Sequence, residues 1–182
     1  HGIPDFQPRT HAMSNDYEKR LLQWLQDAYA MEQEAETMMK AFAGRLENYP
    51  DLRQRVERHV EETRLQADRI GGCIERLGGS LPTAKSLFAS LMAQVHATGN
   101  AMMSDEVVKG VGISYAFENM EVASYRALIV AAREAGHGEI ATVCENILAE
   151  EQAMADWLLE HHTGLVKRFL QREAAEGVTA KR

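Results

Sequence analysis

The sequence predicts an all-α protein, a bundle of four long helices with a helical crossover between the second and the third. Apolar residues recur alternately three and four positions apart over four stretches, each long enough to cross a bundle. No segment shows the two-residue alternation of a half-buried strand. After residue 12 only two prolines occur, Pro50 and Pro82, and both fall between helical stretches.

The length of 182 residues is enough for one domain with a substantial core. Residues 1–12 contain the other two prolines, and we expect them to be a cloning scar that precedes a native start at Met13. The bundle is then expected over residues 13–172, followed by a frayed tail over 173–182.

The charge and the apolar runs exclude several classes of partner. A net charge of −7 argues against nucleic acid or an anionic membrane surface as a partner. The longest apolar run, residues 127–132, is too short to span a bilayer. Cys73 and Cys144 both fall on apolar helical stripes, so we expect buried free thiols in a cytoplasmic protein.

The first two helices are predicted over residues 15–46 and 52–77. Each helix presents one row of residues to the bundle interior, which we call its core row. In the first helix the core row consists of Leu21, Leu25, Ala28, Glu32, Ala35, Met39 and Phe42. In the second it consists of Leu52, Val56, His59, Thr63, Gln66, Ile70, Cys73 and Leu77. A turn at 48–51 joins the two helices, and Gly78 with Gly79 ends the second.

A shorter helix is predicted over residues 84–101, and two long helices follow over 105–135 and 139–172. The core row of the third long helix consists of Val107, Val111, Ser114, Glu118, Glu121, Tyr125, Leu128 and Ala132. That of the fourth consists of Ile140, Cys144, Ile147, Glu151, Met154, Leu158, His161 and Leu165. Because short links join the first to the second helix and the third to the fourth, each pair should form an antiparallel hairpin. The long crossover leaves the second and third helices parallel, which is the ferritin-like form of a four-helix bundle.

Acidic residues occupy the middle of the core rows. They are Glu32 in the first helix, Glu118 and Glu121 in the third, and Glu151 in the fourth, with His59, Glu62 and Gln66 at the same height in the second. Buried carboxylates that converge repel one another unless cations neutralise them. The sequence therefore predicts a centre for two divalent metal ions, iron or manganese, held by Glu32, His59, Glu62, Gln66, Glu118, Glu121 and Glu151.

The pattern departs from the usual di-metal bundle in one respect. That pattern takes one Glu from each of two helices and a Glu-x-x-His pair from each of the others. Here Gln66 and Met154 stand where the two histidines are expected. A thioether is a poor ligand for iron(II) or manganese(II), so Glu62, Glu121, Gln66 and His59 are the candidate replacements.

Four segments resemble the YciE/YciF-type ferritin-like stress proteins of bacteria: residues 25–32, 59–66, 117–125 and 150–156. The resemblance covers about Tyr17 to His162. It implies a four-helix ferritin-like fold, a dimer and a di-metal centre, although the His-Tyr usual in the third helix is replaced by Asn119-Met120. Residues 66–69 and 151–158 are also similar to bacterioferritin segments, with Gln66 and Met154 in place of its histidine ligands.

Three functions fit these observations. The first is a metal-binding protein of the stress-response type with weak oxidase or peroxide-consuming activity, in which Tyr125 and Asp156 orient the ligands. The second is a non-catalytic interaction protein with a vestigial polar core, and the third is iron storage. We expect a homodimer through apolar residues outside the core rows, namely Leu22, Met31, Val60, Ile129 and Val143.

Overall fold

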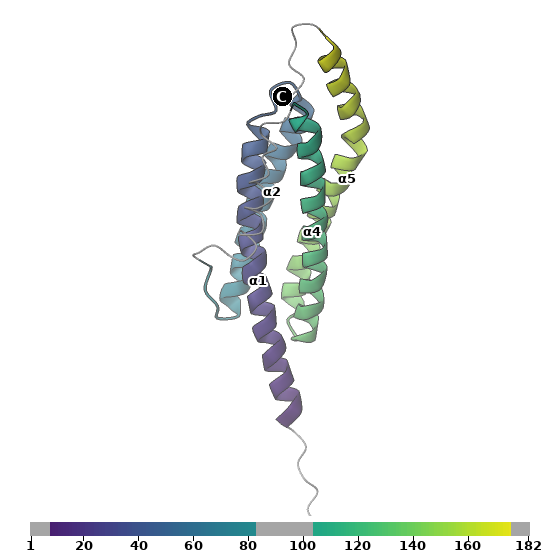
Figure 1. The fold of residues 1–182 in the computed structure, drawn as a ribbon. Coiled ribbons are helices and arrows are strands. Elements are labelled where there is room, and N and C mark those ends of the chain that lie inside the picture. The colour runs from purple at the N-terminus through teal and green to yellow at the C-terminus, as the bar shows by residue number, and fades with distance from the viewer. Residues whose placement is uncertain (1–7, 83–103, 176–182) are drawn as a thin grey trace, which may run out of the picture.

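The computed structural model describes residues 8–82 and 104–175, and this part of the chain is all-helical. It contains α1 (Pro8–Ala43), α2 (Pro50–Arg76), α4 (Glu106–Glu134) and α5 (Gly138–Ala174) (Figure 1). No strand occurs in these two ranges. The predicted all-α class is confirmed. The predicted helix over 84–101 lies outside the described residues, as does most of the predicted tail.

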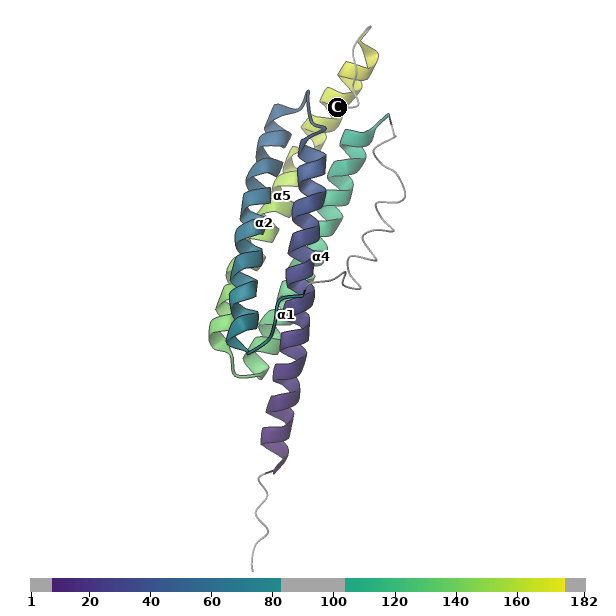
Figure 2. The ribbon, with the colours of Figure 1, turned by 90° about the vertical axis from the view of Figure 1, so that its left-hand side faces the viewer.

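The four helices form two antiparallel hairpins, α1 with α2 and α4 with α5. The first is closed by a turn over residues 44–49 and the second by residues 135–137. The hairpins pack so that α1 lies beside α4 and α2 beside α5 (Figure 2). In Figure 1 α2 and α4 run in the same direction, as the ferritin-like topology requires.

The helix ends follow local backbone chemistry. Pro50 is the first residue of α2, where its missing N–H costs no hydrogen bond. Gly78 and Gly136 have φ values of +73° and +81°, so each reverses the chain in a conformation that other residues rarely adopt. The boundaries of α1 differ from the prediction, because this helix begins at Pro8 and ends at Ala43 rather than spanning 15–46.

The core rows are buried almost as predicted. Every core-row residue of α1 and α4 is buried, including Glu32, Glu118 and Glu121. The core row of α2 is buried throughout, whereas Leu77, just beyond the end of α2, is partly buried. In α5 the row is buried only as far as Leu158. His161 is exposed and Leu165 is partly buried, although Phe169 further along α5 is buried. Cys73 and Cys144 are buried free thiols, as expected.

The expected dimer surface needs correction. Met31 and Val60 are only 2% and 5% exposed, because they pack inside the protomer. Leu22, Ile129 and Val143 are partly buried against the same core. The large apolar side chains that are exposed in the described ranges include Tyr17, Trp24 and Val130. Within these ranges no helix carries an apolar stretch long enough to cross a membrane.

Candidate metal centre

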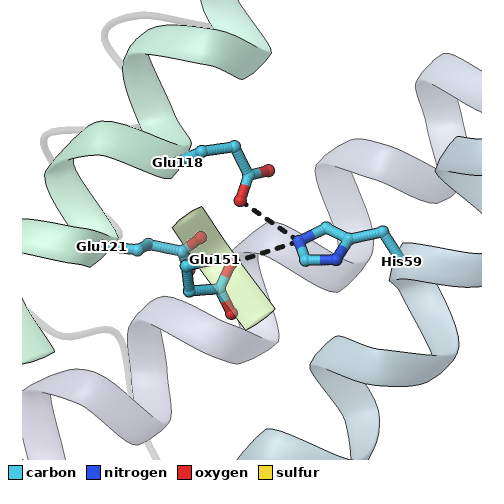
Figure 3. Close-up of side chains that lie close together, drawn as sticks. All are labelled: His59, Glu118, Glu121 and Glu151. Atoms are coloured by element: carbon cyan, nitrogen blue, oxygen red, sulfur yellow. Dashed lines mark hydrogen bonds and ion pairs between the residues drawn. The ribbon is translucent and has the colours of Figure 1, made fainter. Parts of the chain in front are cut away.

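A group of four buried side chains occupies the middle of the bundle. His59 comes from α2, Glu118 and Glu121 from α4, and Glu151 from α5 (Figure 3). One ligand atom from each lies within 4.8 Å of the others. We call these four residues the His/Glu cluster. Glu118 and Glu121 are one helical turn apart, so the same face of α4 presents both carboxylates.

His59 joins the helices of the cluster. Its Nε2 atom lies 3.1 Å from Oε2 of Glu118 and 3.2 Å from Oε2 of Glu151. On the other side of the ring, Nδ1 lies 2.7 Å from Oε2 of Glu62. Arg55 also contacts Glu62, with 3.4 Å between its guanidinium and the same carboxylate oxygen. The imidazole therefore lies between two buried acids and one acid that reaches the surface.

Glu32 adds a buried acid from α1, the one described helix that contributes no residue to the His/Glu cluster. Its side chain is completely buried, and its Oε1 atom accepts a hydrogen bond from the hydroxyl of Tyr125. The charges of Glu151 and Glu118 both act on Glu32, so it shares their electrostatic environment. All four helices of the described chain thus contribute an acidic or imidazole group to the middle of the bundle.

Several carboxylate oxygens in this region receive no hydrogen bond from a described residue. They include Oε2 of Glu32, Oε1 of Glu118, both oxygens of Glu121 and Oε1 of Glu151. Buried polar atoms are nearly always hydrogen-bonded, so acceptors of this kind call for a ligand or a proton. Carboxylate and imidazole groups are the ligands that iron(II) and manganese(II) prefer. The donor set therefore fits a divalent metal of this class.

The pKa values of the acids reflect burial and mutual repulsion. Burial raises the pKa of Glu118 to about 7, despite the hydrogen bond with His59. Burial and the charge of Glu151 raise the pKa values of Glu32 and Glu121 well above their ordinary range. Without a cation these carboxyl groups hold protons that exposed glutamates have already lost at neutral pH.

His59 and Glu151 shift in the opposite sense to what burial alone would produce. Burial disfavours the imidazolium, but hydrogen bonds to Glu118, Glu151 and Glu62 outweigh it and raise the pKa of His59 to about 12. Burial likewise opposes ionisation of Glu151, yet its contact with His59 lowers its pKa. The metal-free cluster thus contains an imidazolium facing at least one ionised carboxylate.

Two of the predicted ligands, which we call the edge residues, are not members of the His/Glu cluster. Glu62 contacts Nδ1 of His59, and its side chain is 30% exposed. Gln66 is buried, but its amide nitrogen donates to Oε2 of Glu150 over 2.8 Å, while its Oε1 has no donor. Asp156 is exposed and accepts a hydrogen bond from Gln152, so it does not orient a ligand.

Sequence reasoning missed the residues that hold these edge groups. Arg69 lies 2.6 Å from Oε2 of Glu150 and so fixes the acceptor of the Gln66 amide. Arg55 likewise holds the carboxylate of Glu62 through an ion pair. The sequence did carry a signal, because Arg69 follows Gln66 by three positions on α2 and Glu150 precedes Glu151. Met154 is fully buried in the place of the expected histidine.

Comparisons with known proteins agree with this architecture. A protein of Xanthomonas campestris pv. campestris is 54% identical, covers 88% of this chain and 99% of its own, and superposes with a TM-score of 0.77. The stress protein YciF of E. coli is 21% identical over 84% of this chain and 98% of its own, with a TM-score of 0.70. The bacterioferritin-related protein from Bacteroides fragilis, a dodecameric thioferritin, is 17% identical over 91% of this chain and 97% of its own, with a TM-score of 0.63.

These similarities extend over the whole bundle, and the last of them identifies its fold as ferritin-like. Residues 16–171 match a family described as a domain of unknown function (DUF892), which includes all four described helices except the ends of α1 and α5. The chain therefore belongs to the DUF892 family, and its fold is that of YciF, as the four sequence segments predicted.

Proposed function

We propose that the protein binds two divalent metal ions, iron or manganese, in a carboxylate centre at the middle of the bundle. The observation that carries the proposal is the convergence of three buried carboxylates and one imidazole within 4.8 Å, several of whose oxygens have no donor. A buried acidic group of this density is costly unless cations neutralise it. A ferritin-like bundle is an architecture in which such centres are built.

The charges match two ions rather than one. Glu32, Glu118, Glu121 and Glu151 together carry four negative charges when ionised, which two divalent cations balance. The His/Glu cluster would hold the first ion. Glu32 would hold the second ion with Glu121 and Glu151, since their charges act on one another.

The edge residues have supporting roles in this proposal. With a metal bound, His59 would present a neutral Nε2 to the ion and donate its Nδ1 proton to Glu62, which fixes the ring. Gln66 offers Oε1 as a neutral ligand while Glu150 holds its amide nitrogen. Glu62 and Gln66 therefore complete or orient the ligand shell.

The reaction that we propose is weak oxidase or peroxide-consuming chemistry in a stress response. A redox-active divalent metal would supply the electrons for such a reaction. Burial of the four cluster residues excludes bulk water from the centre, and His59 holds a proton on Nδ1, next to Glu62. The stress role is supported by similarity to YciF, which is described as a stress protein.

The experiment that tests this proposal is metal analysis of protein purified without chelator. About two ions per chain are expected after loading with iron(II) or manganese(II), and fewer in Glu118→Ala and Glu151→Ala. A wild-type chain that stays metal-free in equilibrium dialysis against excess of either ion would favour a non-catalytic interaction protein. A solution mass of many subunits with many ions per chain would favour iron storage.

A further inference from the structure

A cavity of about 210 Å³ lies near one end of the bundle, where α2 begins and α5 passes beyond its neighbours. We call it the end cavity. It is separate from the metal centre. Leu52, Val111 and Leu158 line it, and each is seven residues from a member of the His/Glu cluster, on α2, α4 and α5 respectively. Seven residues are two helical turns, so the cavity lies about 10 Å from the cluster along the bundle.

The aliphatic part of the end cavity is preformed. Leu52, Val111 and Leu158 are 6%, 2% and 1% exposed, so packing holds them in place. Together with the less buried Leu165 they make the floor of the cavity apolar, which favours a ligand with an apolar face.

One wall of the end cavity is aromatic. The rings of Trp157 and His161 are stacked, with centroids 4.0 Å apart and an angle of 17° between their planes. Nδ1 of His161 also lies 2.8 Å from the carbonyl oxygen of Trp157, which fixes the ring of His161 on α5. A stacked pair of this kind offers a flat face to a planar ligand.

The other wall carries positive charge. The guanidinium of Arg168 lies 5.4 Å from the centroid of the buried Tyr49 ring, so a cation–π contact holds this charge beside the cavity. His162 also lines the cavity, and Asp51 is the one acidic residue that lines it among the described residues. The end cavity thus combines an apolar floor, a flat aromatic wall and a cation at its rim.

We propose that the end cavity binds a small aromatic carboxylate, a single ring that bears one acid group. The ring would cover the aliphatic floor beside Trp157, and the carboxylate would pair with Arg168. A simple inorganic anion would leave the floor uncovered, and an uncharged ring would leave Arg168 without a counter-charge. The volume suits one ring rather than a dinucleotide or a peptide.

The test is a fluorescence titration with benzoate. The chain has two tryptophans, and Trp24 is exposed on α1, so Trp24→Phe leaves Trp157 as the single reporter beside the cavity. The titration is done with chelator present, because benzoate binding in the end cavity does not require metal. A negative titration then contradicts the end cavity alone and says nothing about the metal centre. We expect a saturable change in Trp157 emission with benzoate, weaker binding of cyclohexanecarboxylate and none of inorganic phosphate.

Gly164 gives a variant that closes the cavity without disturbing the fold. It lines the cavity, and a Cβ added there would meet no heavy atom within 4 Å. Gly164→Leu should abolish benzoate binding while the melting temperature stays equal or rises, because glycine is a poor helix former. Gly164→Ala should retain binding. Arg168→Gln should weaken it about tenfold, and Arg133→Gln, on an exposed arginine of α4 outside the cavity, should not.

Loss of binding in Gly164→Leu together with weakening in Arg168→Gln would establish the site. Three results would each overturn it: a wild-type titration without a saturable change, equal affinity in Gly164→Leu, or phosphate that binds as well as benzoate.

Discussion

Nε2 of His59 lies 3.1 Å from Oε2 of Glu118, although the two residues are 59 positions apart in the chain. The contact crosses from one hairpin to the other, because His59 belongs to α2 and Glu118 to α4. Neither residue has any measurable exposure to solvent. An ion pair in such surroundings is a strong constraint, since removal of one partner leaves a charge that water cannot reach.

Replacement of His59 by glutamine is expected to destabilise the metal-free protein. The change removes the imidazolium that faces Glu118 and Glu151 and leaves their negative charge without its counter-charge. The expected loss is about 3 kcal/mol, or roughly 10 °C in melting temperature at neutral pH. Thermal unfolding with chelator measures it, with Glu61→Gln on the exposed face of α2 as the control. Equal melting temperatures for the wild type and His59→Gln would contradict this role.

Replacement of Glu121 by glutamine should have effects of opposite sign on stability and on metal binding. Both carboxylate oxygens of Glu121 lack a donor, and burial raises its pKa well above the ordinary range. Glutamine removes the cost of burying the acid, so the metal-free protein should gain about 1 kcal/mol, or about 3 °C. It should also bind fewer than two ions per chain.

The matched control for Glu121→Gln is Glu61→Gln, because the side chain of Glu61 is 63% exposed on α2. Glu61→Gln should change neither the melting temperature nor the number of metal ions bound per chain. A Glu121→Gln protein that gains stability yet binds as much metal as the wild type would show that Glu121 is not a ligand.

The stability of the metal-free protein should decrease with rising pH relative to the metal-loaded protein. The folded-state pKa of Glu118 is raised from an ordinary value of 4.5 to about 7, and those of Glu32 and Glu121 are also raised well above 4.5. The folded chain therefore binds more protons than the unfolded chain, and this contribution to stability is complete below pH 4.5 and lost as pH rises.

His59 and Glu151 act over other ranges of pH. The pKa of His59 rises from 6.5 to about 12, so its contribution is complete below pH 6.5 and declines above it. The lowered pKa of Glu151 contributes stability above its ordinary value of 4.5, which is lost as pH falls through its folded pKa. The decline from about pH 5 to 7.5 is therefore set chiefly by the acids with raised pKa values.

The difference in stability between the metal-free and metal-loaded protein is measured as melting temperature against pH, once with chelator and once with saturating manganese(II). Bound cations require ionised ligands and bind only the folded chain, so the gap between the two curves should widen with pH. The gap in melting temperature between the two curves should narrow in Glu118→Gln. Parallel curves would show that these acids do not share a metal.

The protein is expected to form a two-fold dimer. Tyr17, Trp24 and Val130 are exposed along a groove between α1 and α4 that Arg20 and Glu134 also line. A two-fold axis across this groove would cover the apolar side chains and place Arg20 opposite an acid of the second copy. Light scattering should give twice the mass of one chain.

Val130→Glu should shift the dimer toward monomer, because it introduces a charge into the proposed interface. Leu159→Glu, at a side chain that is 58% exposed on α5, is the control and should leave the mass unchanged. A mass of twelve or twenty-four chains for the wild type would contradict the dimer.

The bundle and the positions of its buried acids could be predicted because helical periodicity alone determines which residues face inward. Glu32, Glu118, Glu121 and Glu151 were all predicted on this basis, and all are buried. The periodicity does not specify side-chain rotamers or ion pairs between helices. The amide of Gln66 donates to Glu150, and the carboxylate of Glu62 reaches the surface beside Arg55. The direction of neither side chain could be predicted from residue spacing.

The joining of two hairpins by the His/Glu cluster also determines when the centre can form during folding. Within one hairpin only α4 and α5 bring acids together, and the imidazole of His59 arrives only when α2 packs against them. If the hairpin of α4 and α5 forms first, its acids meet before their counter-charge is present. Docking of the first hairpin should then be the slow step at neutral pH, and mild acid should accelerate it, because protons substitute for the missing imidazolium.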